Sequence, residues 1–408
     1  MLLRELLKSA SSSTVLIAGT GYLVDMFDLF MFNIVRVTSL SDLGLVSQQV
    51  TQTGIQIINS QLAGLIVGSY VWGVLGDKYG RKRVLLGSIL LYSLTSCLTS
   101  AVTETWHYAA LRFLTGMGLA GELGAGIALI SEEHADTKRG LGIGMFIIMG
   151  FVGVLVATAC AQILPWRACY FFGGGLGLSL LVFRMRLRES TLFEQTRSRP
   201  GLKFGGLSQI LTNRTLLRKY AAGILMLTPT VFIPQIVWSL SPEIATAKHL
   251  PGVQPASILA CGYTCVIASD FLAICLAEKL KSRRLCIAIF SVLGCLVFAL
   301  FLVYPYKTAF EYYALSSLLG LAFGTWVVGS TMVAEMFGTN LRATASTTIP
   351  NFCRGTVILM NTVMVAIKPY MGLTEAIAVV GTVISLISIT SLLFLQDTYG
   401  RDLSFTDG

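Results

Sequence analysis

The sequence has few charged residues. Asp, Glu, Lys and Arg together make up 12% of its 408 residues, whereas a soluble protein carries about 25%. Hydrophobic residues make up 54%, which is more than soluble domains can bury, because large soluble chains divide into domains with wetted surfaces. The scarcity of charge excludes an ordinary soluble protein and predicts a chain that is solvated by a lipid bilayer.

Residue patterns for catalysis and metal binding are also missing. The three histidines fall near or outside the expected membrane boundaries, and no CxxC spacing occurs among the nine cysteines, which we expect to be buried reduced thiols. No phosphate-binding glycine loop is present, and no nucleophile–base set or metal set falls at membrane depth. We therefore expect neither an enzyme nor a cofactor, and an ion gradient rather than ATP as the driving force.

Twelve apolar runs are long enough to cross a bilayer, which takes about twenty residues of helix. They lie near 14–36, 55–76, 84–102, 108–131, 141–164, 167–187, 219–240, 255–277, 285–304, 312–334, 343–366 and 373–395. We expect the first run to be a retained helix, because Asp25 and Asp28 interrupt it and it lacks a convincing cleavage site for a signal peptide. The only long polar linker, 188–218, separates the runs into two sets of six. The pattern predicts an all-α membrane protein with an N-terminal bundle over 1–187, a cytoplasmic linker over 188–218 and a C-terminal bundle over 219–408.

The basic residues predict the orientation in the membrane. If both termini are cytoplasmic, 23 of the 30 Lys and Arg residues fall in cytoplasmic segments, as the positive-inside rule requires. This distribution explains the net charge of +9 without a nucleic-acid partner. Arg184 is counted here among the cytoplasmic residues and Arg36 among those at the outer face.

An internal repeat supports two similar halves. GDKYGRKR at 76–83 returns in degenerate form as AEKLKSRR at 277–284, and the seven-residue spacing of a glutamate and an arginine after the fourth helix returns after the tenth. The repeated features are offset by 201 to 208 residues. A duplicated six-helix unit explains the offset, and transporters with such repeats place their substrate between them.

Several motifs resemble those of the major facilitator superfamily. GDKYGRKR is similar to its signature loop, and LRFLTGMG, RLRESTLFE, AEMFGTNLRATAS and DTYGRDL are similar to further family patterns in the same order. GYLVDMFDLF and GLAGELGAGIALISEE resemble motifs of the proton symporters for organic acids, sialate and phosphate. The chain lacks the Asp-Tyr-Pro version of phosphate importers and the Gly-Pro pair of drug antiporters.

This resemblance implies proton-coupled import of a small organic anion by alternating access of two bundles. The alternatives are a sugar or phosphate importer, an exporter or uniporter on the same fold, and a non-transporting membrane receptor. We expect a monomer in a bacterial inner membrane.

Carboxylates at membrane depth are candidates for proton coupling, because buried charges are costly and a carboxylate in a poorly hydrated cavity is easier to protonate. Asp25 and Asp28 lie about midway along the first helix, and Glu122 lies midway along the fourth. One or more of them could instead be a structural partner of Arg112 or Arg36, although Glu122 and Arg112 are ten residues apart on one helix, or about 15 Å, which excludes a direct pair between these two. Asp270 is a further candidate, with a counter-ion role or a position at the cytoplasmic exit as its alternatives.

Arg354 is the basic residue expected deepest in the membrane, because it follows Arg342 by twelve residues, or about 18 Å of helix. A guanidinium at this depth suits an anionic substrate, although it could also pair with Asp270 or a first-helix carboxylate. The other candidate substrate contacts are polar or aromatic residues at similar depth: Tyr22, Gln235, Tyr263, Trp326 and Asn351. We expect Trp238, by contrast, to anchor the protein at the outer interface.

Charged residues at the cytoplasmic helix ends are expected to form gates that hold the inner side closed. The set comprises Asp77, Arg81, Glu132, Arg139, Glu278, Arg283, Glu335 and Arg342. Arg112, which lies in the fourth helix outside the cytoplasmic segments, is a further structural candidate. All of these are structural candidates rather than substrate ligands.

Overall fold

The computed structural model describes residues 13–133, 139–185, 207–401, 405 and 407, and these residues are almost entirely helical. The first six long helices are α2 (Ser13–Asp42), α3 (Ser47–Tyr79), α4 (Arg81–Thr99), α5 (Thr105–Glu133), α6 (Arg139–Ile163) and α7 (Trp166–Arg184). A short helix, α9 (Leu207–Thr212), precedes α10 (Arg214–Phe232), the π-helical segment η1 (Ile233–Trp238) and α11 (Ser241–Ala247). The chain continues through α12 (Pro255–Leu280), α13 (Arg283–Val303), α14 (Ala309–Ala322), α15 (Trp326–Met336), α16 (Arg342–Met371), α17 (Leu373–Ser391) and the 3₁₀ turn η2 (Leu392–Phe394).

Twelve of these units are long enough to span a membrane, counting α10 with η1 and α14 with α15 as single spans. Ten are apolar enough to be identified by length and hydropathy. The other two, α4 with 19 residues and α16 with 30, carry more polar residues. Nineteen residues of helix cover about 28 Å, close to the thickness of a bilayer core. The twelve-helix membrane architecture expected from the apolar runs is therefore present.

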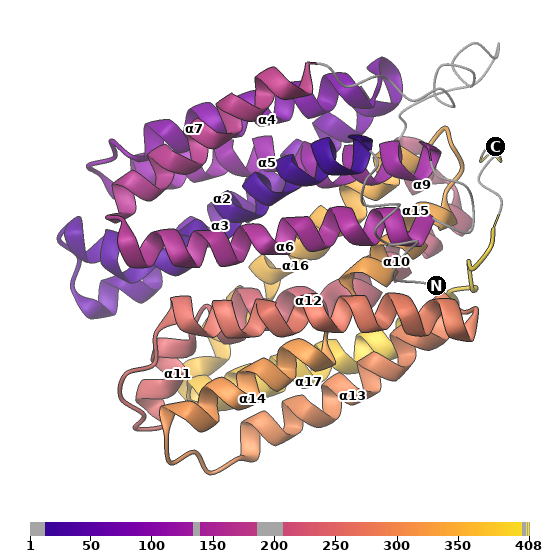
Figure 1. Cartoon of the computed structure of the whole chain (residues 1–408). Coiled ribbons are helices and arrows are strands. Elements are labelled where there is room, and N and C mark those ends of the chain that lie inside the picture. Colours follow the sequence, from indigo (N-terminus) through magenta and orange to yellow (C-terminus); the bar gives the residue numbers. More distant parts are fainter. Residues whose placement is uncertain (1–12, 134–138, 186–206, 402–404, 406, 408) are drawn as a thin grey trace.

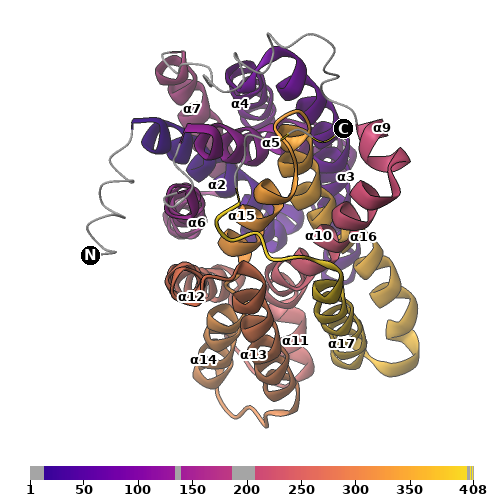
Figure 2. The ribbon, with the colours of Figure 1, turned by 90° about the vertical axis from the view of Figure 1, so that its right-hand side faces the viewer.

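The helices form two groups. In Figure 1 the indigo-to-magenta helices of the first half lie above most of the orange-to-yellow helices of the second half, and Figure 2 looks onto the helix ends from the right-hand side of that view. The halves meet through α16 against α3 and α5, and through α12 against α6. We call the end that holds the α3–α4 connection the basic-loop end, and the opposite end the α11 end.

Glycines bring α3 and α5 into close contact. A side chain on Gly64 or Gly68 of α3 would collide with the backbone of Phe113 or Met117 on α5. The Trp72 indole N–H donates to the Met117 carbonyl at 2.7 Å. Close approach of glycine-bearing surfaces is how membrane helices gain packing contacts without a hydrophobic driving force.

Two spans depart from a single straight helix. The run expected as one helix near 312–334 is interrupted at 323–325, and the run near 219–240 ends in the six-residue π segment Ile233–Trp238. Pro234 lies inside this segment and has no N–H for a helical hydrogen bond, which explains the change of register. Membrane proteins tolerate irregular backbone where it lies against other protein segments or lines a cavity.

The linker was predicted at 188–218. Its part up to residue 206 lies outside the described residues, as does the N-terminal stretch 1–12. The second half begins earlier than expected, at Arg214, because the Asn213 side chain caps α10 by accepting hydrogen bonds from the N–H groups of Thr215 and Leu216.

Candidate functional site

A narrow cavity of about 40 Å³ lies between the two halves. Its wall draws residues from α2, α6, α10, η1, α12, α14 and α16, together with Phe323 beyond the end of α14 and Trp326 at the start of α15. The apolar and aromatic part of the wall includes Met26, Phe30, Phe151, Trp238, Tyr263 and Trp326. Gln235 and Arg354 add polar groups. A mainly apolar wall with a few polar groups is typical of small-molecule sites.

Arg354 brings a positive charge to this cavity. Its side chain is 4% exposed, and its guanidinium donates to the Asn351 side-chain oxygen at 3.3 Å and to the Tyr22 hydroxyl at 3.2 Å. The guanidinium carbon lies 5.2 Å from the centre of the Trp326 ring. Among the described residues no carboxylate lies within 4.0 Å of it, so neither Asp270 nor a first-helix carboxylate is its counter-ion.

The predicted substrate contacts divide into two sets. Gln235, Tyr263 and Trp326 line the cavity with Arg354. Tyr22 and Asn351 lie behind the guanidinium and hold it through the hydrogen bonds described above. Asn351 also donates to the Ala120 carbonyl at 3.0 Å and thereby ties α16 to α5. These two residues position Arg354 rather than face the cavity.

Trp238 does not lie at a membrane interface, contrary to the prediction. It is 1% exposed, lines the cavity and packs with its ring 5.7 Å from that of Tyr263. The cause is the π segment, which ends at Trp238, together with Gly262, where a larger residue would collide with the indole. Periodicity along an ideal α-helix could not reveal this orientation.

Asp25 is a buried carboxylate without a hydrogen-bond partner. It is 0% exposed, and neither oxygen has a donor within the described part of the chain. It lies between Tyr22 and Met26 on α2, and both of those side chains contact Arg354. The charged groups acting on Asp25 are Glu122, Arg354, Asp28 and Arg184, none of which forms an ion pair with it.

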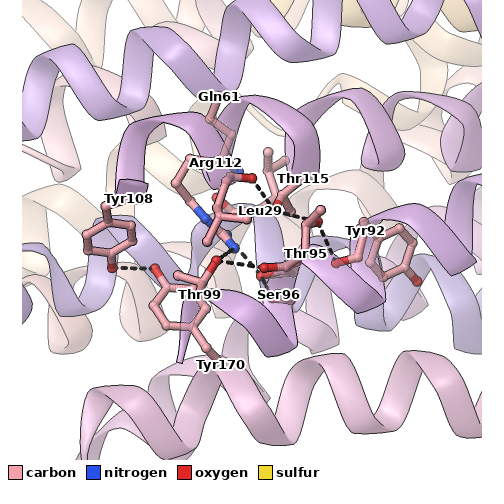
Figure 3. A network of polar contacts seen from close by, with 12 residues as sticks. Leu29, Gln61, Tyr92, Thr95, Ser96, Thr99, Tyr108, Arg112, Thr115 and Tyr170 are labelled. Atoms are coloured by element: carbon pink, nitrogen blue, oxygen red, sulfur yellow. Dashed lines mark hydrogen bonds and ion pairs between the residues drawn. The ribbon is translucent and has the colours of Figure 1, made fainter. Parts of the chain in front are cut away.

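Asp28 belongs to a separate polar network. It accepts from Arg112 at 3.1 Å and from the Ser96 hydroxyl at 2.6 Å, while Arg112 also donates to Thr99 at 2.9 Å. The Arg112 guanidinium lies 4.6 Å from the centre of the Tyr170 ring, as Figure 3 illustrates. Asp28 therefore pairs with Arg112, which was the structural alternative to a role in proton coupling.

Glu122 pairs with an arginine that the sequence did not suggest. Both side chains are 0% exposed, and the Arg184 guanidinium contacts both Glu122 oxygens, with one Nη1–Oε2 distance of 2.6 Å. Arg184 also donates to the Ala18 carbonyl at 2.9 Å. Counting Arg184 among the basic residues of the cytoplasmic segments was wrong, because this ion pair draws it into the bundle.

We expect Glu122→Gln to destabilise the protein by about 3–5 kcal/mol, because it leaves the Arg184 guanidinium buried without a counter-ion. Thermal unfolding of the purified protein in detergent measures the loss. Replacing both residues, as Glu122→Gln with Arg184→Gln, should restore much of the stability. A Glu122→Gln protein that unfolds at the wild-type temperature would contradict this structural role, and Asp42→Asn serves as a control at an exposed ion pair.

Asp270 caps the second part of the interrupted span. Its carboxylate accepts from the Val327 N–H at 3.1 Å in the first turn of α15, and the residue is 0% exposed. The carboxylate therefore compensates for the break at 323–325, where the backbone N–H groups have no helical partner. Asp270 does not pair with Arg354, so the counter-ion role that was one alternative for Asp270 is wrong.

Charged contacts at the basic-loop end join the halves. Asp77 of α3 lies 3.6 Å from Arg81 and accepts from the backbone N–H and the hydroxyl of Thr344 on α16, at 2.9 and 2.5 Å. The side chains of the predicted gate pair, Glu132 and Arg139, lie outside the described part of the chain.

The second half has a corresponding cluster. Arg283 lies 3.0 Å from Glu278 and 3.7 Å from Glu335. Arg342 begins α16 and is buried. Beyond α17, Asp397 accepts from the backbone N–H groups of Arg283 and Arg284 and from the Ser282 hydroxyl. Partial burial opposes ionisation of Asp397, but these hydrogen bonds outweigh it and lower the pKa of the carboxyl.

The α11 end is also closed, by a pair that was not predicted. Arg36 of α2 donates to Glu243 of α11 at 2.7 Å, across the interface between the halves. With Asp77 and Thr344 joined at the other end, the described conformation is held closed on both sides of the cavity. Glu243 was not predicted as a gate residue, because the sequence pattern indicates a short loop after the seventh apolar run.

Comparisons with known proteins identify the class of molecule. A model of the Major Facilitator Superfamily matches residues 18–360. A probable 4-methylmuconolactone transporter of Cupriavidus pinatubonensis is 25% identical over 410 residues, covering 93% of this chain and 89% of the relative. The 4-hydroxybenzoate transporter PcaK of Pseudomonas aeruginosa is 32% identical over 152 residues, which cover 35% of this chain and 33% of that protein.

A solved structure shares the fold. The proton:xylose symporter XylE, bound to 6-bromo-6-deoxy-D-glucose, superimposes with a TM-score of 0.75 at 16% sequence identity, covering 96% of this chain and 97% of that one. The two bundles, the twelve spans and the family motifs agree with this match. The chain is a multi-pass membrane transporter of the Major Facilitator Superfamily and not an enzyme.

Proposed function

We propose that this transporter imports a small organic anion together with a proton. The observation that carries the proposal is the Arg354 guanidinium, which reaches an aromatic cavity and forms no ion pair with any carboxylate of the described residues. A buried cation without a directly paired carboxylate is costly, so a ligand that pairs with it is favoured. A carboxylate meets this need, because it accepts two parallel hydrogen bonds from a guanidinium.

The remainder of the wall suits an apolar body attached to that carboxylate. Phe30, Phe151, Trp238 and Tyr263 present aromatic surface, whereas few polar side chains are available. A sugar would need several hydrogen-bond partners, and phosphate would favour more than one cation. The names of two relatives, which refer to 4-methylmuconolactone and 4-hydroxybenzoate, support small organic acids or related compounds as the substrate class.

Asp25 is the proposed proton site. Asp28 and Glu122 each have an arginine partner, and Asp270 has a backbone donor, whereas Asp25 has no partner among the described residues. A carboxylate that is removed from water without a direct partner is easier to protonate than one held in an ion pair. Glu122 and Asp28 are charged groups near Asp25, but each is held in an ion pair and is not proposed to exchange the proton itself.

The charge balance of the closed cavity explains how proton uptake and substrate binding are coupled. With Arg112–Asp28 and Arg184–Glu122 each neutral, the empty site is neutral when Asp25 is ionised beside Arg354. The loaded site is neutral when Asp25 is protonated and the substrate carboxylate pairs with Arg354. Either ligand alone leaves a net charge in the closed cavity, which is costly. Proton and anion therefore favour the same closed state, as coupling requires.

In the proposed orientation the basic-loop end faces the cytoplasm of a bacterium and the α11 end faces outward. The positive-inside distribution supports this assignment. The charged clusters around Asp77 and Arg283 would then be the inner gate. The transporter would work as a monomer, without a cofactor, with the proton gradient as its driving force.

Reconstitution into proteoliposomes tests the proposal. A panel of aromatic and aliphatic carboxylates, 4-hydroxybenzyl alcohol, xylose and inorganic phosphate is first screened for thermal stabilisation of the purified protein. We expect carboxylates to stabilise it, and an inward proton gradient to drive their accumulation until a protonophore is added. Stabilisation by xylose or phosphate instead would contradict the anion assignment, and accumulation that ignores the gradient would contradict symport.

A further inference from the structure

Two side-chain contacts link α2 to the second half on the side of the cavity that faces the α11 end. Asn33 donates to the Gln235 side chain at 3.2 Å, and Gln235 lines the cavity. One helical turn further along α2, Arg36 donates to Glu243 at 2.7 Å and to the Ser239 carbonyl at 3.2 Å. These contacts follow one another along α2 from the cavity wall toward the α11 end.

A cleft of about 560 Å³ opens at that surface. Glu243 and Thr51 line this cleft, and the Thr51 hydroxyl donates to Glu243 at 3.1 Å. Lys368 adds a positive charge to the same wall. Glu243 thus joins Arg36 to the wall of the cleft, while Asn33, one turn away on α2, joins that helix to the wall of the central cavity.

The guanidinium of Arg36 is only partly used. The residue is 0% exposed, and its hydrogen bonds to Ser239 and Glu243 both come from Nη2, while Nε and Nη1 are buried without a partner in the described part of the chain. Glu243 is the more accessible member of the pair, with 21% of its side chain exposed. The pair is therefore accessible from the cleft at Glu243, and its arginine has spare donors for a second carboxylate.

We propose that Arg36 is a second anion-binding subsite and that Arg36 and Glu243 together form the outer gate, which the substrate carboxylate opens by replacing Glu243 on the guanidinium. This inference rests on the proposed function, since it requires an anionic substrate. Replacement of one carboxylate by another keeps Arg36 neutralised throughout. A neutral solute cannot make this exchange, so the gate selects for anions before the substrate reaches Arg354.

Gate closure and anion transit are tested separately. Closure is followed by the distance between spin labels placed at Glu104 and Lys307, which lie in exposed loops of the two halves at the α11 end. Labels attached through a genetically encoded ketone leave the nine native cysteines unchanged. Transit is followed as the initial uptake rate of a carboxylate that stabilises the wild-type protein.

We expect Glu243→Gln to shift the label distances toward longer values, and the charge swap Arg36→Glu with Glu243→Arg to bring them back. Because the swap moves the cation to the other half, uptake should nevertheless stay at least about tenfold slower than wild type. Equilibrium stabilisation by the carboxylate at Arg354 should change less than twofold. Asp42→Asn, which breaks a pair with Arg167 inside the first half, is the matched control and should leave distances and uptake unchanged.

Two results would overturn the inference. Wild-type uptake in the charge-swapped protein would make the pair a structural bridge rather than an anion subsite. Unchanged label distances in Glu243→Gln would remove the pair from the gate. A failure of the proposed function looks different, because then no carboxylate would stabilise or enter even the wild-type protein.

Discussion

Replacing Arg354 with alanine is expected to weaken binding of a carboxylate substrate by about 10- to 100-fold. The estimate corresponds to the loss of hydrogen bonds to a charged group, worth about 1.5–3 kcal/mol. Calorimetric titration of the purified protein measures it. Because Arg354 makes no ion pair with the described residues, its removal leaves no carboxylate without a partner, and the variant should fold.

Two variants sharpen this test. Arg354→Lys keeps the charge but loses the planar pair of donors, so it should recover only part of the affinity. Arg167→Ala removes an arginine whose side chain is 39% exposed at the α11 end, and should bind the substrate as the wild type does. Unchanged affinity in Arg354→Ala would mean that the substrate is neutral or binds elsewhere.

Replacing Asp25 with asparagine is expected to abolish proton-driven accumulation while exchange of substrate across the membrane continues. The reason is the charge balance of the closed site. Asparagine imitates the protonated acid, so the loaded site stays neutral and can close, but the empty site carries the uncompensated charge of Arg354 and cannot return. Counterflow needs only the loaded transition, whereas net uptake needs both.

Parallel assays in proteoliposomes distinguish these outcomes. Substrate-loaded vesicles report exchange, and empty vesicles with an inward proton gradient report accumulation. Asp28→Asn is the matched control, because it removes a carboxylate one turn away that is paired with Arg112. It should reduce thermal stability rather than separate exchange from accumulation. Concentrative uptake by Asp25→Asn would assign the proton to another group.

Much of the architecture follows from hydropathy and repeats. Membrane spans can be predicted from a single sequence, because backbone N–H and C=O groups in lipid must form their hydrogen bonds within their own helix. Each span is therefore a local property of the chain. The break at 323–325 and the π segment at Ile233–Trp238 were not predicted. Both depend on contacts that arrive from elsewhere, such as the Asp270 carboxylate at the Val327 N–H.

Partners of buried charges could not be read in the same way. Sequence spacing excluded a pair between Glu122 and Arg112 within one helix, and that exclusion stands. It offered no reason to join Glu122 with Arg184, which is 62 residues away, or Arg36 with Glu243, 207 residues away. Such pairs depend on how the helices are placed and rotated in the bundle, which no periodicity within one helix specifies.

By itself the sequence determined that the protein spans a membrane, that it has two similar halves, and which intramembrane charges need an explanation. It could do so because the cost of placing a residue in lipid depends mainly on that residue and its neighbours in the chain. The tertiary structure decided which of those charges are neutralised by one another. It thereby separated Asp25 and Arg354 from the paired residues, because the energy of a buried charge depends on what lies within a few ångströms of it in space.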